Sequence, residues 1–217
     1  MEREWNLAEV SDGKVYSSSD MAKVGCNDCK GCSACCRNMG QSIVLDPYDV
    51  YQLTVGQNQS FQELLATSVE LNVVEGLILP NLKMQETSKS CYYLNEQGRC
   101  RIHSIRPGMC RMFPLGRVYE NDTFQYFLQI HECKAEQKTK VKIRQWLGVS
   151  DLKRYENFIS DWHYFLKKYQ NQAMKGMYDE GALKQLNMRI LNVFYLTPYD
   201  RNSDFYEEYE TRKCSFR

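Results

Sequence analysis

The chain has 217 residues, a formal net charge of +1 and ten cysteines. This length allows a single domain, or a small domain with a substantial extension, and a real hydrophobic core. The balanced charge gives no overall case for nucleic-acid or membrane binding, and no apolar run approaches the ~18 residues of a transmembrane helix. The first six residues are charged and lack the apolar stretch of a secretory signal, so we expect a cytoplasmic protein.

Residues 1–24 resemble a polar, loop-rich lead-in, with turn residues at Ser17–Asp20. A C-x2-C-x2-C-x2-C-C run follows, formed by Cys26, Cys29, Cys32, Cys35 and Cys36. The x2 spacing turns the chain back so that successive sulfurs face a common centre, as in zinc knuckles and iron–sulfur loops. In a reducing cytoplasm such cysteines favour metal binding over disulfides.

Local signals predict several elements after this run. Asp46 is suited to an N-cap and Pro47 to the first position of a helix that carries Val50 to Leu53. Ser60 and Glu63 form a capping-box pattern for a second helix, which ends near Leu65. Two short apolar runs, Leu71–Val74 and Leu77–Leu79, are separated by Glu75-Gly76 and predict a hairpin.

The middle of the chain contains the remaining cysteines of interest. Cys91 and Cys100 flank a turn at Asn95–Arg99, and each is expected to begin a short strand. Residues 106–111 predict a turn or a single helical turn. A further hairpin is expected from Val118–Tyr119 and Phe124–Ile130.

From residue 139 the pattern becomes helical. Thr139–Leu147 predicts basic amphipathic turns closed by Gly148, and Leu152–Tyr169 predicts a longer helix whose aromatic stripe belongs to the core. Leu183–Tyr195 predicts one more helix. We therefore expect an α+β protein with a lead-in at 1–24, a cysteine-cluster metal-binding domain at 25–138, and a helical extension with a tail at 139–217.

Counting ligands suggests more than one centre. A tetrahedral zinc ion or a cubane cluster takes four thiolates, and we expect the adjacent side chains of Cys35 and Cys36 to diverge. Two sites, or one polynuclear site, are therefore expected. The eight candidate ligands are Cys29, Cys32, Cys35, Cys36, Cys91, Cys100, Cys110 and Cys133.

Iron–sulfur and zinc centres compete for these ligands. Cys29, Cys32 and Cys35 match the three closely spaced cysteines of bacterial ferredoxins, in which a remote fourth cysteine completes a [4Fe–4S] cluster. The usual x3-Cys-Pro ending is replaced by Cys36. Zinc sites normally show two separated C-x2-C pairs, and the second half of this chain has none. An iron–sulfur cluster is favoured, and zinc is the alternative.

The order of these motifs resembles the CxxCxxCC family of zinc- or iron-chelating domains. The resemblance extends from about Cys29 to Cys133 and is most specific at Arg106-Pro107-x2-Cys110-Arg111-x-Phe113-Pro114. It implies metal chelation and makes Cys133 the eighth cysteine of the pattern. The cysteine region is also similar to that of flagellin lysine N-methylases, which implies that such a domain can belong to an enzyme. Cys26 extends the pattern, and Cys214 lies outside it.

Basic and imidazole groups near the cysteines have supporting roles in this interpretation. Arg106 and Arg111 flank Cys110 and would offset the negative charge of a thiolate centre; binding of a substrate anion is the alternative. His103 and His131 lie near cysteines and are expected to form hydrogen bonds, because enough thiolates are available without them.

Three functional classes fit: an electron-carrying or sensing iron–sulfur protein, a cluster enzyme, and a zinc module whose helical part binds a protein or peptide. The expected primary partner is a metal ion or cluster, with no nucleic acid and no membrane. The pattern assigns no substrate and no oligomeric state.

Overall fold

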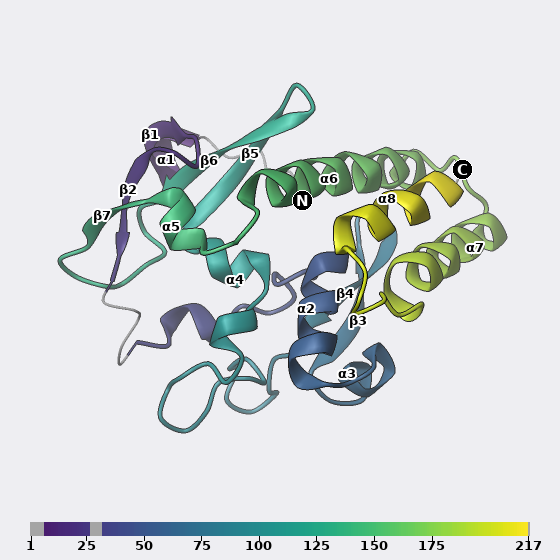
Figure 1. The fold of residues 1–217 in the computed structure, drawn as a ribbon, viewed down its shortest axis with the longest axis horizontal. Helices are drawn as coiled ribbons and strands as arrows, with labels where there is room; N and C mark the ends of the chain where they lie inside the picture. The colour runs from purple at the N-terminus through teal and green to yellow at the C-terminus, as the bar shows by residue number, and fades with distance from the viewer. Residues whose placement is uncertain (1–6, 27–31, 217) are drawn as a thin grey trace. The chain divides into compact units, whose positions relative to one another are not determined.

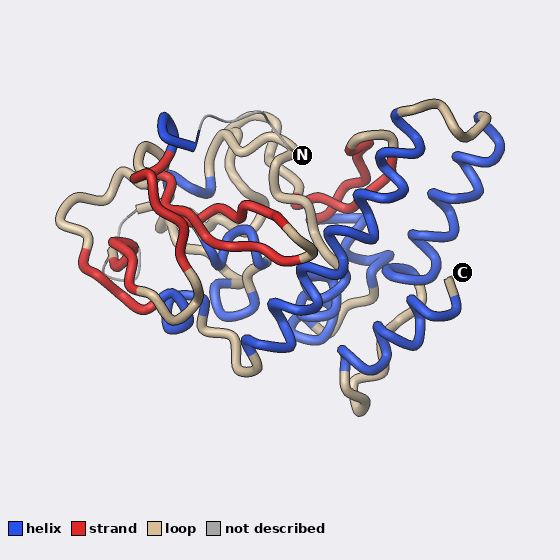
Figure 2. The backbone as a smooth tube through the Cα atoms, turned by 90° about the horizontal axis from the view of Figure 1, so that it is seen from above, coloured by secondary structure: helices blue, strands red, loops and turns tan. Residues whose placement is uncertain are grey.

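The computed structural model describes residues 7–26 and 32–216. It forms two compact units: unit 1 comprises Met1–Gly40, Met84–His103 and Gly108–Asp161, and unit 2 comprises Gln41–Lys83, Ser104–Pro107 and Trp162–Arg217. Helices occur together with small antiparallel sheets, and helix dominates the C-terminal part (Figure 2), which confirms the α+β class. Because each unit takes segments far apart in the sequence, the consecutive domain ranges stay a prediction.

Unit 1 contains two small antiparallel sheets. One has the order β1-β6-β5, from strands Ser11–Tyr16, Thr123–Gln129 and Leu115–Glu120, and the other pairs β2 (Met21–Gly25) with β7 (Thr139–Lys142). The predicted β5–β6 hairpin is confirmed (Figure 1). Its turn residues Asn121 and Asp122 have φ values of 50° and 57°, which these residue types tolerate well.

The prediction of a loop-rich lead-in is wrong for most of residues 7–25. A short helix α1 (Leu7–Val10) precedes β1, and β2 follows the turn. In β2 the side chains of Ala22 and Val24 are buried while their neighbours are more exposed. These two residues join a core that also contains Met112, Leu115, Tyr126, Leu128, Ile143 and Leu147. Partner strands more than 100 residues away therefore decide this structure.

Residues 139–147 are only partly as predicted. The first half is strand β7, and the second is the short helix α5 (Ile143–Leu147), which ends at Gly148 in the left-handed conformation with φ 60°. The expected strands at Cys91 and Cys100 are also wrong. Both residues make only isolated bridges, Met84 to Cys91 and Leu94 to Cys100. The helical turn at residues 106–111 is confirmed as α4 (Gly108–Met112).

Unit 2 begins with the predicted capped helices. Helix α2 (Pro47–Gln57) starts after the N-cap Asp46, and α3 (Phe61–Thr67) starts after Ser60, each with a complete capping box. The hairpin of β3 (Val69–Val74) and β4 (Leu77–Leu82) follows. The segment before α2 bonds to β4, since the Leu45 amide donates to the Pro80 carbonyl at 2.8 Å.

The C-terminal helices form the rest of unit 2. They are α6 (Leu152–Met174), whose first ten residues belong to unit 1, then α7 (Glu180–Leu191), the π-helical turn η4 (Asn192–Leu196) and α8 (Phe205–Ser215). Aromatic rings fill their core: Phe194 lies 4.9 Å from Trp162 and 5.2 Å from Phe165, measured between ring centroids. The buried Tyr195 hydroxyl donates to the Leu45 carbonyl at 3.0 Å. Within residues 7–26 and 32–216, no helix combines the length and apolarity needed to cross a membrane.

The cap of α2 gives a test of this fold. Asp46→Ala removes the side chain that accepts the Asp49 amide at 2.8 Å, so we expect a loss of about 1 kcal/mol in the free energy of unfolding. Denaturant titration measures it. Glu210→Ala, at an exposed position of α8, is the control and should change stability by less than ~0.5 kcal/mol. Equal stability of the two variants would contradict the capping role.

Candidate metal centre

The end of the cysteine run is held by a short 3-10 turn. Helix η2 (Ala34–Cys36) is closed by the Cys36 amide, which donates to the Ser33 carbonyl at 3.0 Å. The sulfur atoms of Cys35 and Cys36 lie 4.0 Å apart. The expectation that these adjacent side chains diverge is therefore wrong. Two thiols can therefore be presented together by three residues of chain.

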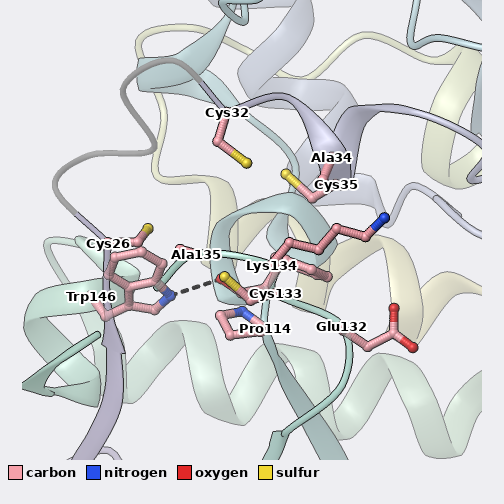
Figure 3. Close-up of a pocket in the computed structure, with 11 residues that line it drawn as sticks. Cys26, Cys32, Ala34, Cys35, Pro114, Glu132, Cys133, Lys134, Ala135 and Trp146 are labelled. Carbon is pink, nitrogen blue, oxygen red and sulfur yellow. Dashed lines mark hydrogen bonds between the residues drawn. The ribbon is translucent and has the colours of Figure 1, made fainter. Parts of the chain in front are cut away.

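Four cysteines line one small pocket in unit 1. Cys26 directly follows β2, Cys32 and Cys35 belong to the cysteine run, and Cys133 follows β6. In Figure 3 the sulfurs of Cys32 and Cys35 point toward one another across from Cys133. The other lining residues are Ala34, Phe113, Pro114, Glu132, Lys134, Ala135 and Trp146. We call this set the thiol pocket.

One wall of the thiol pocket is apolar and held in place by a hydrogen bond. The indole nitrogen Nε1 of Trp146, on α5, donates to the Phe113 carbonyl at 3.1 Å (Figure 3). Phe113 precedes Pro114 through a cis peptide bond. An apolar wall limits access of water to a bound metal, which influences both its ligand chemistry and its redox potential.

Basic side chains lie near Cys133. Lys134 lines the thiol pocket, and the Lys138 ammonium donates to the Cys133 carbonyl at 2.9 Å. Glu132 also lines the pocket and carries the opposite charge. The surroundings of Cys133 therefore carry charges of both signs.

A second cysteine group is formed by Cys36, Cys91 and Cys100. The Cys91 amide donates to the Cys36 carbonyl at 2.7 Å, and Cys100 forms a bridge with Leu94. Burial raises the pKa of the Cys91 thiol, and the neighbouring thiols of Cys100 and Cys35 raise it further. The cause is that like charges close together oppose ionisation. Cys35 is thus close to the second cysteine group while it also lines the thiol pocket.

The other candidate residues are distributed more widely. Cys110 lies on α4, and the Arg111 guanidinium donates to the Leu147 carbonyl at 3.2 Å. Arg106 belongs to the short segment Ser104–Pro107 of unit 2. Cys214 is exposed on α8. Cys29 lies outside the described residues. His103 begins the 3-10 turn η3 (His103–Ile105), and His131 follows β6.

The chemistry of the donors is that of a sulfur site. In residues 7–26 and 32–216 every cysteine is a thiol rather than half of a disulfide. Within the same ranges, no three Cys, His, Asp or Glu side chains lie close enough together to hold one ion. The described thiols of unit 1 therefore include a close pair, Cys35 and Cys36, but no set of three around one point.

Sequence reasoning did not find Trp146 or the apolar wall. No spacing signal links Trp146 to the cysteine run, since 111 residues separate it from Cys35 and only the fold brings both to the same pocket. Cys26 had a signal, because it continues the x2 spacing by one step.

Comparison with known protein families gives a match over residues 28–144 to CxxCxxCC, described as a "Putative zinc- or iron-chelating domain". The matched range includes seven of the cysteines discussed above that lie in described residues: Cys32, Cys35, Cys36, Cys91, Cys100, Cys110 and Cys133. Cys26 and Cys214 lie outside it. No curated protein and no solved structure matches the chain.

The wall of the thiol pocket can be tested by a single substitution. Trp146→Phe keeps a ring on the wall but removes the indole donor to the Phe113 carbonyl. We expect a loss of about 1 kcal/mol in the free energy of unfolding, the usual contribution of one hydrogen bond. Denaturant unfolding followed by circular dichroism measures it. If the variant is as stable as the parent chain, this hydrogen bond does not support the wall.

Proposed function

Since the chain belongs to the CxxCxxCC family, we propose that it holds an iron–sulfur cluster, of the [4Fe–4S] type, through cysteine thiolates. The observation that carries the proposal is that Cys133 lines the same pocket as Cys32 and Cys35. Ferredoxin-type clusters need three closely spaced cysteines and a remote fourth. In this proposal Cys32, Cys35 and a third cysteine of the run form the closely spaced set, and Cys133 is the remote ligand.

The surroundings of the thiol pocket support this assignment. Thiols are soft ligands suited to iron–sulfur clusters and to zinc. The wall formed by Phe113, Pro114 and Trp146 would limit contact of the cluster with water, and Lys134 would offset part of its negative charge. A cluster in this position supplies one-electron chemistry, so the protein would carry or sense electrons. A reducing cytoplasm, which keeps cysteines as thiols, is the compartment that suits such a protein.

The remaining candidate ligands would form a second centre. Backbone hydrogen bonds and a bridge link the segments of the second cysteine group, Cys36, Cys91 and Cys100. Cys110 is proposed as the fourth thiolate of this centre. We propose that Arg111 offsets the charge of the thiolates near Cys110, as arginines do around anionic metal centres, and the same role for Arg106 stays a prediction from the sequence.

Zinc is the alternative occupant, and the second cysteine group favours it there. The segment from Met84 to His103 contains isolated bridges and turns but no strand or α-helix of its own. Short segments of this kind gain stability from a structural zinc ion bound by cysteines. In this case the metal would hold unit 1 in shape while the helical part binds a protein or peptide partner.

The proposed remote ligand gives the first test. Purified without oxygen, the parent chain should be coloured and contain iron and acid-labile sulfide. Cys133→Ser should lower both contents at least about tenfold. The reason is that loss of a metal ligand weakens binding at least as much as loss of a residue that hydrogen-bonds to a ligand. Cys214→Ser, at an exposed site on α8, is the matched control and should keep the parent content.

A colourless parent chain that contains stoichiometric zinc and no sulfide would overturn the iron–sulfur proposal and leave the zinc alternative. If Cys133→Ser instead keeps the full iron and sulfide content, Cys133 is not the remote ligand. Circular dichroism of the stripped proteins checks that both variants are folded.

Removal of the metal tests the structural role. A chelator should increase hydrogen exchange in residues 84–103 far more than in the capped helix α2, because α2 is held by its own capping box and apolar packing. Mass spectrometry of peptides from the two segments measures the difference. Unchanged exchange in residues 84–103 after complete metal removal would contradict a structural centre at the second cysteine group.

A further inference from the structure

The thiol pocket contains a cysteine that belongs neither to the eight candidate ligands nor to the matched family range. Cys26 lies two residues before residue 28, where the family match begins. It nevertheless lines the same pocket as Cys32, Cys35 and Cys133 (Figure 3). Three of these thiols belong to the cysteine run and the fourth is Cys133, so the fold brings the two parts of the chain to one pocket.

The position of Cys26 is set by the ladder between β2 and β7. Met21 pairs with Lys142, Ala22 with Val141, and Gly25 with Thr139. A Cβ atom on Gly25 would overlap Thr139 Oγ1 and lie 2.8 Å from Val141 Cγ2, so the glycine lets the two backbones approach closely at this point. Cys26 is the next residue. It therefore enters the pocket from a strand that is anchored by backbone pairing and by two buried side chains.

Cys26 is also half-buried, in contrast to the exposed Cys214 on α8. Its pocket neighbours include Trp146, which lies on the helix that directly follows β7. The strand β7 pairs with β2 and runs directly into α5, the helix that carries Trp146 of the apolar wall. The backbone of Cys26 is thus held beside the pocket by the β2–β7 ladder.

We propose that Cys26 is a ligand of the metal centre in the thiol pocket, together with Cys32, Cys35 and Cys133. This inference rests on the proposed function of that pocket. Four thiolates complete the outer ligands of one cubane cluster, whose ligands lie farther apart than those of a single ion. The ligand class is therefore an iron–sulfur cluster. Cys26 extends the ligand set of this chain beyond the range that the family model matches.

Alkylation of the whole chain tests the inference without a substitution. The chain is reconstituted with iron and sulfide, and separately with Zn²⁺ alone, and its reaction with iodoacetamide is compared with that of the chelator-stripped chain. Peptide mass spectrometry follows each cysteine. A metal-bound thiolate is shielded, so we expect Cys26 to react at least about tenfold more slowly in a loaded chain. Cys214 is the internal control and should react equally fast in all samples.

The outcomes separate the inference from the proposed function. If Cys32 and Cys133 are protected but Cys26 reacts as fast as in the stripped chain, Cys26 is not a ligand and the proposed function stands. If none of the pocket cysteines is protected in either loaded chain, the proposed function fails and the inference fails with it.

Substitution gives a second, independent readout. Cys26→Ser should keep at most about a tenth of the iron and acid-labile sulfide that Cys214→Ser holds after the same reconstitution, since a hydroxyl is a much poorer cluster ligand than a thiolate. Iron and sulfide analysis measures both contents, and circular dichroism confirms that the stripped variant is folded. Equal contents in the two folded variants would overturn the assignment of Cys26.

Discussion

The pairing of β2 with β7 is the constraint on which the arrangement of unit 1 depends. It joins residues 21–25 to residues 139–142 and so closes a loop of more than 100 residues. Loop closure of this length has an entropic cost, which burial of Ala22 and Val24 against Ile143 and Leu147 helps to offset. The result is that the beginning of the cysteine run lies beside a segment that the sequence separates widely from it.

The register of this ladder has chemical consequences. A shift of one residue would turn Ala22 and Val24 away from the core, so burial selects one register strongly. The same register determines where the chain leaves β2 and therefore where Cys26 enters the thiol pocket. Packing of apolar side chains thus positions the Cys26 sulfur, although none of those side chains lines the thiol pocket.

The cysteine-bearing segments show the opposite balance of forces. Residues 32–36 and 84–103 contain turns, isolated bridges and short 3-10 helices. Burial raises the pKa of the Cys91 thiol, and the thiols of Cys100 and Cys35 raise it further, so a metal cation would be needed to stabilise its thiolate form there. Unit 2 has no such requirement. Its rings and capped helices form a continuous apolar core, and the only cysteine in its described part, Cys214, is exposed.

The amino-acid sequence by itself determined the features that depend on near neighbours. Asp46 and Ser60 begin their helices, because capping uses groups within three residues. Asn121-Asp122 forms the predicted hairpin turn for a similarly local reason, and the spacing of the cysteine run predicted the metal-chelating family to which the chain belongs. The tertiary structure alone decided which strands form at 11–25 and 139–142, and that Cys91 and Cys100 begin none. It also decided which thiols share a pocket with Trp146. The reason is that the local sequence pattern of a segment does not reveal which distant segment it pairs with or packs against.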